Sequence, residues 1–279
     1  MPTLDRITIY PVKSLDGLDV EACAVLPSGA LEHDRRWQLV DLEGRVVNAK
    51  RTARFHAIRA GFDLASRTVA FARAAGPAEE FPLVPGPAGP CGWLSEALGV
   101  EVLLVERAEG GFPDDRDAAG PTLVSTASLA EVARWFALDL DECRRRFRAN
   151  LEIGGCDAFW EDTLASPARP ELGPGAGLLA DLPADPYADL PPPEPREFAI
   201  GAARFRATGV CRRCVVPTRD SRTGLPTEFF RDIFAARRRR SLRADVDAAA
   251  WGTFERLGIN TRPTAPGWLA RGDVIDETA

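Results

Sequence analysis

The first third of the chain alternates apolar and polar residues in short runs, which is the pattern of half-buried β-strands. Glu43–Gly44 separates two such runs and predicts the turn of a hairpin, whereas residues 93–98 predict a short helix. The prolines and glycines of residues 76–92 predict a loop. The strands predicted in this region cover residues 6–12, the hairpin 37–47, and residues 55–62, 67–71 and 100–105.

Further along the chain, helical and strand patterns are mixed. The clearest helix start is Ser128, because a serine N-cap with Glu131 three residues later forms a capping box. Leu129, Val132 and Phe136 then give this helix one apolar stripe. Strands and helices do not alternate, so the pattern predicts a β-rich α+β protein and argues against Rossmann and TIM-barrel folds. The other predicted elements are helices over 141–147 and 227–240 and strands over 148–153, 198–207, 257–260 and 273–275.

Residues 165–196 differ in composition from the rest of the chain. They hold nine of the 23 prolines and show no apolar periodicity. A segment of this kind contributes little to a packed core. We therefore expect a surface excursion in extended or polyproline conformation that is dispensable for folding.

The chain has 279 residues, enough for one large domain or two small ones. Acidic residues outnumber basic ones by 41 to 35, and the net charge of −6 argues against nucleic-acid binding, which needs a basic face. No stretch reaches the roughly 18 apolar residues of a membrane helix and no leader opens the chain, so we expect a cytoplasmic protein without membrane contact. Lysine is rare: Lys13 and Lys50 stand against 33 arginines, so each lysine position carries more information than an arginine position.

The densest chemical signal is Cys211-Arg-Arg-Cys214. A structural zinc site would need a second ligand pair, but the other four cysteines are isolated and the chain has two histidines. A thioredoxin-like dithiol would open a helix, whereas residues 215–217 predict continued extended chain. A third interpretation is one thiolate in an electropositive pocket, where Arg212 and Arg213 favour the thiolate and hold an anion. The plain alternative is two half-buried cysteines beside two surface arginines.

Three further segments place a cation at the end or edge of a predicted strand. Lys13 and Ser14 lie side by side after the first strand, where both can donate to a phosphate. Asp34-Arg-Arg-Trp37 and Phe147-Arg-Ala-Asn150 each put an arginine beside a strand, which suits an anion site or a surface ion pair equally. Taken alone, none of the three segments decides between these interpretations. The sequence contains no Ser/His/Asp set, P-loop or zinc-protease motif.

Taken together and in order, these segments resemble the MOSC-domain family, named after the C-terminal domain of molybdenum cofactor sulfurases. The similarity is strongest to the two-part members with an N-terminal MOSC β-barrel, which include the mitochondrial amidoxime-reducing component and its bacterial relatives. It implies an N-terminal antiparallel β-barrel-like domain over residues 1–105, packed with a C-terminal MOSC β-barrel domain over residues 106–279. The resemblance covers most of the chain and rests on Tyr10-Pro-Val-Lys-Ser14, Asp34-Arg-Arg-Trp37, Ser128-Leu-Ala-Glu131, Phe147-Arg-Ala-Asn150, Gly155-Cys-Asp157, Glu161-Asp162, Cys211-Arg-Arg-Cys214 with residues 218–224, Gly258-Ile-Asn-Thr261 and Gly272-Asp273.

The resemblance also implies a set of site residues. In the family, the second cysteine of the Cys-x-x-Cys-like element is the molybdenum ligand, which makes Cys214 the expected ligand and leaves Cys211 outside the metal site. A pterin phosphate carries about two negative charges, and cations from three distant segments would supply its donors. Molybdenum would take one soft sulfur from the protein. The residues that match contacts to a molybdopterin-type molybdenum cofactor are Lys13, Ser14, Arg35, Arg148 and Asn150, with Arg212 and Arg213 beside the ligand and Ser125 near a hydroxyl contact.

The implied function is a molybdenum-dependent oxidoreductase that reduces N-hydroxylated compounds: amidoximes, hydroxylamines and N-hydroxylated bases. Because the sequence shows no iron–sulfur cysteine cluster, a separate flavin or iron–sulfur protein is the expected electron donor. Asp157 or Asp162 could relay a proton or be structural. The alternatives are a non-catalytic carrier of molybdenum cofactor or sulfur, and a binding module in which Cys211 and Cys214 hold zinc. Pyridoxal phosphate is not expected, since only two lysines could form its Schiff base.

Overall fold

The computed structural model describes residues 1–73, 76–86, 89–114, 118–165, 196–243, 246 and 251–277. Its strands form one eight-stranded sheet, two three-stranded sheets and one two-stranded sheet. Nearly all of the proline-rich segment predicted at 165–196 lies outside the described residues. Within the described ranges, no helix combines the length and the apolar character that a membrane crossing requires.

The large sheet incorporates strands from both ends of the chain. The N-terminal strand β1 pairs antiparallel with β11, and β16 near the C-terminus pairs with β12 at the other edge. β10 and β11 run parallel. From edge to edge the strands are β16 (Ile275–Asp276), β12 (Glu197–Ile200), β13 (Ala203–Arg212), β14 (Arg256–Ala265), β10 (Leu123–Ser125), β11 (Leu151–Gly154), β1 (Thr3–Ile9) and β2 (Leu18–Val20). The loop that follows β1 therefore starts inside the large sheet.

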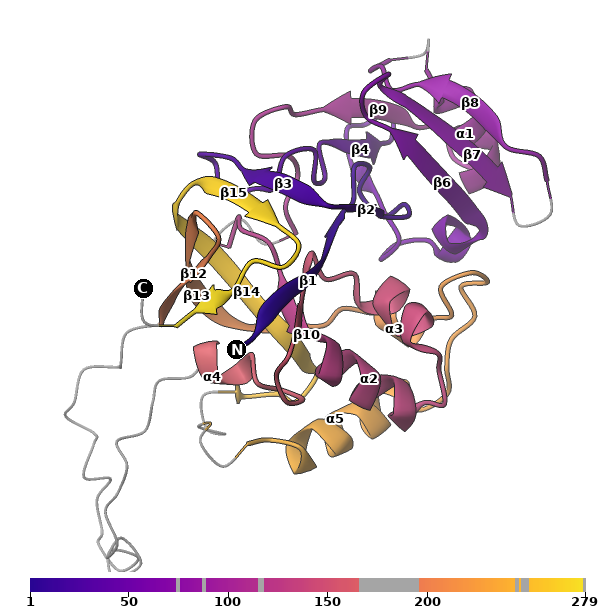
Figure 1. Ribbon diagram of the computed structural model, residues 1–279. Coiled ribbons are helices and arrows are strands. Elements are labelled where there is room, and N and C mark those ends of the chain that lie inside the picture. The colour runs from indigo at the N-terminus through magenta and orange to yellow at the C-terminus, as the bar shows by residue number, and fades with distance from the viewer. Residues whose placement is uncertain are drawn as a thin grey trace, which may run out of the picture.

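A second group of strands lies beside the large sheet, at the upper right of Figure 1. β4 pairs with β5 and with β9, and β7 pairs with β6 and with β8, all antiparallel. β3 and β15 form the small two-stranded sheet that links the two groups. The bounds are β3 (Ala22–Val25), β4 (Trp37–Val40), β5 (Val46–Val47), η1 (Ala53–Ala57), β6 (Ile58–Asp63), β7 (Thr68–Arg73), β8 (Glu79–Pro82), α1 (Cys91–Leu98), β9 (Leu103–Glu106) and β15 (Gly267–Ala270).

The remaining helices lie together on the large-sheet side of the molecule (Figure 1). Ser125 caps α2, and its side chain accepts a hydrogen bond from the Ser128 amide. Asp139 caps α3, whose first turn is acidic and whose last turn is basic, as the helix dipole favours. These elements are α2 (Thr126–Trp135), α3 (Leu140–Phe147), α4 (Asp162–Ala165), η3 (Val216–Thr218) and α5 (Phe230–Arg240).

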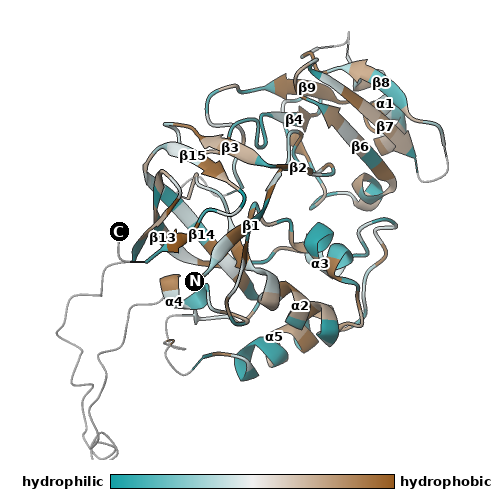
Figure 2. Cartoon of the chain, viewed as in Figure 1, coloured by the Kyte–Doolittle hydropathy of each residue, from teal (hydrophilic) through white to brown (hydrophobic). Residues whose placement is uncertain are grey.

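Four apolar clusters occur in the described residues, the smallest of them around Trp251. The strands of the large sheet share one cluster, which includes Ile7 and Phe205, and the N-terminal group packs a second around Trp37. Helices α2, α3 and α5 enclose a third that contains Phe147 and Phe234. Figure 2 shows mixed hydrophobic and hydrophilic positions along β1, whereas α5 is largely hydrophilic teal. Since α5 buries only one stripe, its arginine-rich end is a solvated face except at Arg238.

The β-rich α+β prediction is confirmed, and the 37–47 hairpin is the pair β4–β5. Three local predictions are wrong. The 76–92 segment is not all loop, because β8 lies in it and pairs with β7. The cap of α2 is Ser125, which places the helix start before Ser128. Residues 215–217 do not continue as a strand, because the 3₁₀ turn η3 contains Pro217. The predicted domain boundary at 105/106 stays a prediction.

A buried polar cluster lies where α2 meets the segment before α4. The Ser125 and Ser128 hydroxyls are 2.7 Å apart, and Ser128 Oγ donates to Glu161 Oε2 at 3.0 Å. Asp162 and Arg238 form a wholly buried ion pair at 2.6 Å. Burial, reinforced by the neighbouring Asp162 charge, raises the pKa of Glu161 to about 7. Glu161 is therefore strained electrostatically whenever it is ionised.

We predict that Glu161→Gln removes this strain. A carboxyl whose folded pKa is raised binds its proton more tightly in the folded state, so stability falls as pH rises from about 4.5 towards 7. At pH 8 the variant should unfold at a higher temperature than the unmodified protein, and its free energy of unfolding should be about 1–2 kcal/mol larger. At pH 5 the two proteins should have the same stability. Thermal unfolding at both pH values measures this, with the exposed Glu228→Gln as control. A variant that is less stable at pH 8 would contradict it.

Candidate functional site

A large cavity opens where the loop after β1, the end of α3 and the loop after β13 converge. Its volume is about 590 Å³. The side chains that line it include eleven arginines and lysines against four aspartates. The chain as a whole carries a net charge of −6, so positive charge is concentrated here against the overall balance. Such a cavity favours an anionic ligand.

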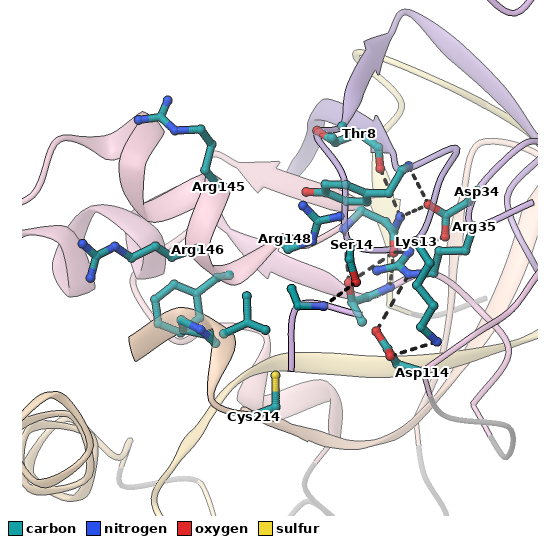
Figure 3. Close-up of a pocket in the computed structure, with 18 of the residues that line it drawn as sticks. Thr8, Lys13, Ser14, Asp34, Arg35, Asp114, Arg145, Arg146, Arg148 and Cys214 are labelled. Atoms are coloured by element: carbon teal, nitrogen blue, oxygen red, sulfur yellow. Dashed lines mark hydrogen bonds and ion pairs between the residues drawn. The ribbon is translucent and has the colours of Figure 1, made fainter. Parts of the chain in front are cut away.

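One end of the cavity holds three cations around one carboxylate. Lys13 Nζ lies 3.1 Å from Asp114 Oδ1, Lys50 Nζ lies 3.3 Å from the same oxygen, and Arg35 Nε lies 4.0 Å from Oδ2. Burial alone would raise the pKa of Asp114, but Arg35 and the two lysines outweigh it and hold that pKa well below its ordinary value. Burial lowers the pKa of Lys13, a shift that Asp114 opposes. Figure 3 shows Asp114 facing Lys13 and Arg35.

Asn150 fixes the segments that carry these cations. Its amide nitrogen donates to Thr8 O at 3.0 Å and to Asp34 Oδ1 at 3.1 Å, so both amide hydrogens are used. Its oxygen accepts from the Thr122 amide at 3.2 Å. Asp34 in turn accepts from the Tyr10 amide at 2.8 Å and pairs with the Arg35 guanidinium. Asn150 is 2% exposed, so these bonds tie strands β1, β10 and β11 together in a dry environment.

Arg148 is the cation at the centre of the cavity that has no charged partner. It follows α3 in the left-handed conformation, with φ of 53°, and its guanidinium lies 4.1 Å from the centre of the Tyr10 ring. Across the residues that the structure describes, no hydrogen-bond acceptor pairs with this guanidinium. Burial lowers the pKa of Arg148, and the nearby Arg35 charge adds to that effect. An anion placed here would relieve an uncompensated charge.

The loop that carries Cys214 is held from behind by Arg213. This guanidinium donates to Leu257 O at 2.9 Å and to Phe147 O at 3.0 Å, which joins the loop to β14 and to the end of α3. β13 ends at Arg212, and the chain enters the turn η3, which contains Pro217, a few residues later. The half-buried Cys214 consequently lines the cavity, opposite the cation cluster in Figure 3. Arg213 thus fixes the position of this loop. Arg212 is exposed at the cavity mouth, where no acidic group in the described ranges pairs with it.

Gly258 allows Arg213 to reach its carbonyl acceptors. Its φ of +67° lies in the left-handed region, and a Cβ there would come within 2.6 Å of Leu123 O and 3.2 Å of Arg213 Nη2. Only glycine fits both constraints.

The structure brings most of the sequence-predicted site residues to this one cavity, and three of them lie elsewhere. Ser125 is wholly buried at the cap of α2, and Asp157 is exposed on the loop after β11. Asp162 is committed to Arg238. The predicted residues that line the cavity are Lys13, Ser14, Arg35, Arg148, Asn150, Arg212, Arg213 and Cys214, and Cys211 lines it as well.

Sequence reasoning missed several lining residues. Tyr10 packs under both Arg148 and Arg35, and its hydroxyl donates to Ala149 O at 3.2 Å. His56 lines the cavity with an Nε2 atom that has no partner in the described parts of the chain, and burial lowers its pKa, followed by the charges of nearby arginines. Asp114 carries no local signal. Tyr10 belongs to the Tyr-Pro-Val-Lys-Ser segment, so the sequence could indicate that it lies near the site. The contact of its ring with two guanidinium groups could not be predicted.

No metal-binding cluster of the ordinary kind accompanies the cavity. In the described ranges, no three His, Cys, Asp or Glu side chains gather closely enough to hold a metal ion. All six cysteines are free thiols.

Comparison with known proteins shows which proteins this chain resembles. Residues 1–84 match the family model of the MOSC N-terminal beta barrel domain. The chain is 27% identical to molybdenum cofactor sulfurases from Drosophila erecta and Drosophila melanogaster over 80% of its length, which is 28% of theirs. It is 22% identical to the one from Danio rerio, covering 81% of this chain and 29% of that protein. The YUAD protein from Bacillus subtilis aligns structurally over 99% of this chain and 94% of that chain, with a TM-score of 0.39 and 12% identity.

The first part of the chain is thus a MOSC N-terminal beta barrel domain. This confirms the resemblance to proteins that begin with such a domain. The chain as a whole is similar to part of the molybdenum cofactor sulfurases, and it spans less than a third of the length of the curated relatives it matches.

We predict that Gly258→Ala destabilises the protein more than a left-handed φ alone explains. Gly44, at the β4–β5 turn, has φ of +77° and no atom within 4 Å of a built Cβ, so Gly44→Ala isolates the backbone cost, about 1–2 kcal/mol. Gly258→Ala adds a steric clash worth about 1–3 kcal/mol. Urea unfolding of the two variants measures the difference. Equal losses would show that the close approach to Arg213 is unimportant.

Proposed function

We propose that the cavity binds a molybdopterin-type molybdenum cofactor, with the cofactor phosphate at the cation cluster and Arg148. The observation that carries the proposal is the unpaired guanidinium of Arg148. Arg148 is half-buried, and a partly desolvated cation without a partner is stabilised when a ligand compensates its charge. Lys13 and Arg35 lie beside it but are already paired with Asp114 and Asp34, so Arg148 is the strongest single contact expected for the phosphate.

The opposite wall suits the metal. Cys214 offers the soft sulfur that molybdenum prefers, and Arg213 holds its loop rigid from behind. Relatives named molybdenum cofactor sulfurases, together with the MOSC N-terminal beta barrel domain, support a role connected with this cofactor. Asn150 has no free amide hydrogen, so its role in the proposal is to position the phosphate-binding segments.

We propose further that the protein is a reductase of N-hydroxylated compounds, the activity implied by the sequence resemblance. Reduction converts R–NH–OH to R–NH₂ and water and consumes two electrons and two protons. The molybdenum cofactor, when bound, supplies the two-electron chemistry, and a separate flavin or iron–sulfur protein supplies the electrons. The chain's own contributions are the thiolate of Cys214 and the electropositive cavity that holds the cofactor. Neither Asp157 nor Asp162 lines the cavity, so neither has a part in the proposed proton supply.

A non-catalytic carrier of the cofactor or of sulfur is the second candidate. Two observations favour it: the relatives are named sulfurases, and Cys211 and Cys214 both line the cavity. A carrier would hold the cofactor without turning over an N-hydroxylated substrate.

We predict that Cys214→Ala abolishes amidoxime reduction, because it removes the thiolate from the metal. Cys211→Ala should keep most of the activity and metal, with a small packing loss. The assay reduces benzamidoxime with dithionite-reduced viologen, and elemental analysis gives the molybdenum content of each variant. Equal loss of activity in both variants would overturn the single-ligand assignment, and bound molybdenum without turnover in the unmodified protein would favour the carrier.

We predict that Arg148→Gln weakens cofactor retention about tenfold, since losing a charge-assisted contact to phosphate costs about 1.5–3 kcal/mol. The folded state should not lose stability, because the variant removes a half-buried charge that has no acidic partner in the described parts of the chain. Molybdenum per chain after extended dialysis measures retention, and circular dichroism checks the fold. Arg134→Gln, a three-quarters exposed arginine on α2, is the control for the change in net charge. Unchanged retention in Arg148→Gln would remove the main support for the phosphate site.

A further inference from the structure

The only two lysines of the chain meet at one carboxylate oxygen. Lys13 and Lys50 lie 3.1 and 3.3 Å from Asp114 Oδ1, although they come from different loops. In a chain with 33 arginines, the convergence of both lysines on one atom marks an anion subsite. The anion that occupies this subsite is a side chain of the protein itself.

The segment that carries Asp114 is held by its backbone and not by this side chain. Lys13 Nζ donates to Phe112 O at 3.0 Å and to Pro113 O at 3.4 Å, and the Phe112 amide donates to Arg35 O at 2.9 Å. Arg107 Nη1 donates to Gly111 O at 3.3 Å. Among the described residues, Asp114 contacts these three cations and no other partner, and it is half exposed, so its carboxylate can turn into solvent while the segment stays in place.

The local charge balance favours a dianion over a monoanion. Lys13, Lys50, Arg35 and Arg148 carry four positive charges, and Asp34 and Asp114 return two negative ones. This surplus of two rises to three when Asp114 turns into solvent, and a phosphate dianion compensates more of it than a monoanion does. A singly charged anion would gain no more from Lys13 and Lys50 than Asp114 already does, whereas a phosphate dianion offers more charge and more acceptor oxygens.

We infer that Asp114 is an internal competitor for the anion subsite, which a phosphate dianion displaces and a carboxylate monoanion does not. The inference rests on the proposed function in so far as it concerns the same cavity. It assigns two further specificity-determining residues: Lys50 binds the phosphate together with Lys13, and Asp114 excludes weaker anions. Cellular carboxylates are thereby kept from the site, while a phosphate-bearing ligand gains entry.

The test uses the full chain prepared without molybdenum cofactor and titrated with inorganic phosphate or acetate at pH 8 and constant ionic strength. Asp114→Asn should bind inorganic phosphate about three- to tenfold more tightly than the unmodified protein, and acetate binding should become measurable. Lys50→Gln should bind phosphate about threefold more weakly. Isothermal titration calorimetry gives the affinities, and Asp114→Ser provides a second variant should the asparagine misfold.

Glu109→Gln is the matched control, because it makes the same change in net charge on an exposed residue close to Asp114 in the chain and outside the cavity. Its phosphate affinity should equal that of the unmodified protein. Phosphate affinity in Asp114→Asn that is unchanged or lower, or an equal gain in Glu109→Gln, would overturn the inference. Because no molybdenum is involved, these results are independent of whether the proposed reductase activity is found.

Discussion

The buried hydrogen bonds of Asn150 are the interaction on which the rest of the site depends. One amide group joins the main chain of β1, the side chain of Asp34 and the segment before β10. Through Asp34 it also fixes Arg35 and the amide of Tyr10. The segments around β1, Asp34 and β10 are therefore held in fixed relative positions at the cavity by hydrogen bonds that water does not weaken. An unsatisfied Asn150 would leave several buried polar groups without partners at once.

Given that frame, the cavity concentrates positive charge in a protein that is acidic overall. Most of its cations are neutralised internally: Arg35 by Asp34, Lys13 and Lys50 by Asp114. Arg148 is an exception within the cavity, as is the exposed Arg212 at its mouth. The Tyr10 ring supports it through its π face, which compensates a cation only partly. This uneven distribution of partners, more than the number of cations, indicates where a ligand phosphate would bind. The thiol of Cys214 on the facing wall adds the one soft donor that the proposed metal needs.

Much of the fold could be predicted from local patterns, because alternation and turn residues act over a few positions. The β4–β5 hairpin and α3 are examples. β8 was not predicted because its proline and charged residues do not form a strand pattern. It forms a strand by pairing with β7. The cap of α2 was misplaced because Ser125 and Ser128 are both competent caps, and only the packing of β10 selects the first.

The site was predictable in part for the same reason. Lys13, Arg148 and Cys214 stand in recognisable segments, and the fold brings those segments to one cavity. Asp114 stands in no such segment: its importance comes from meeting Lys13 and Lys50, which are far away in the chain. The bracing role of Arg213 likewise depends on carbonyls of distant residues. Long-range meetings of this kind leave no periodic trace in a sequence.

The central claim is that this cavity holds a molybdenum cofactor through a phosphate and one thiolate. The most direct measurement is the elemental and phosphate content of the unmodified protein, purified from cells that make the cofactor. The account predicts molybdenum and organic phosphate in equal amounts, approaching one of each per chain, with no stoichiometric zinc. Stoichiometric zinc without molybdenum would contradict it and would favour a metal held between Cys211 and Cys214.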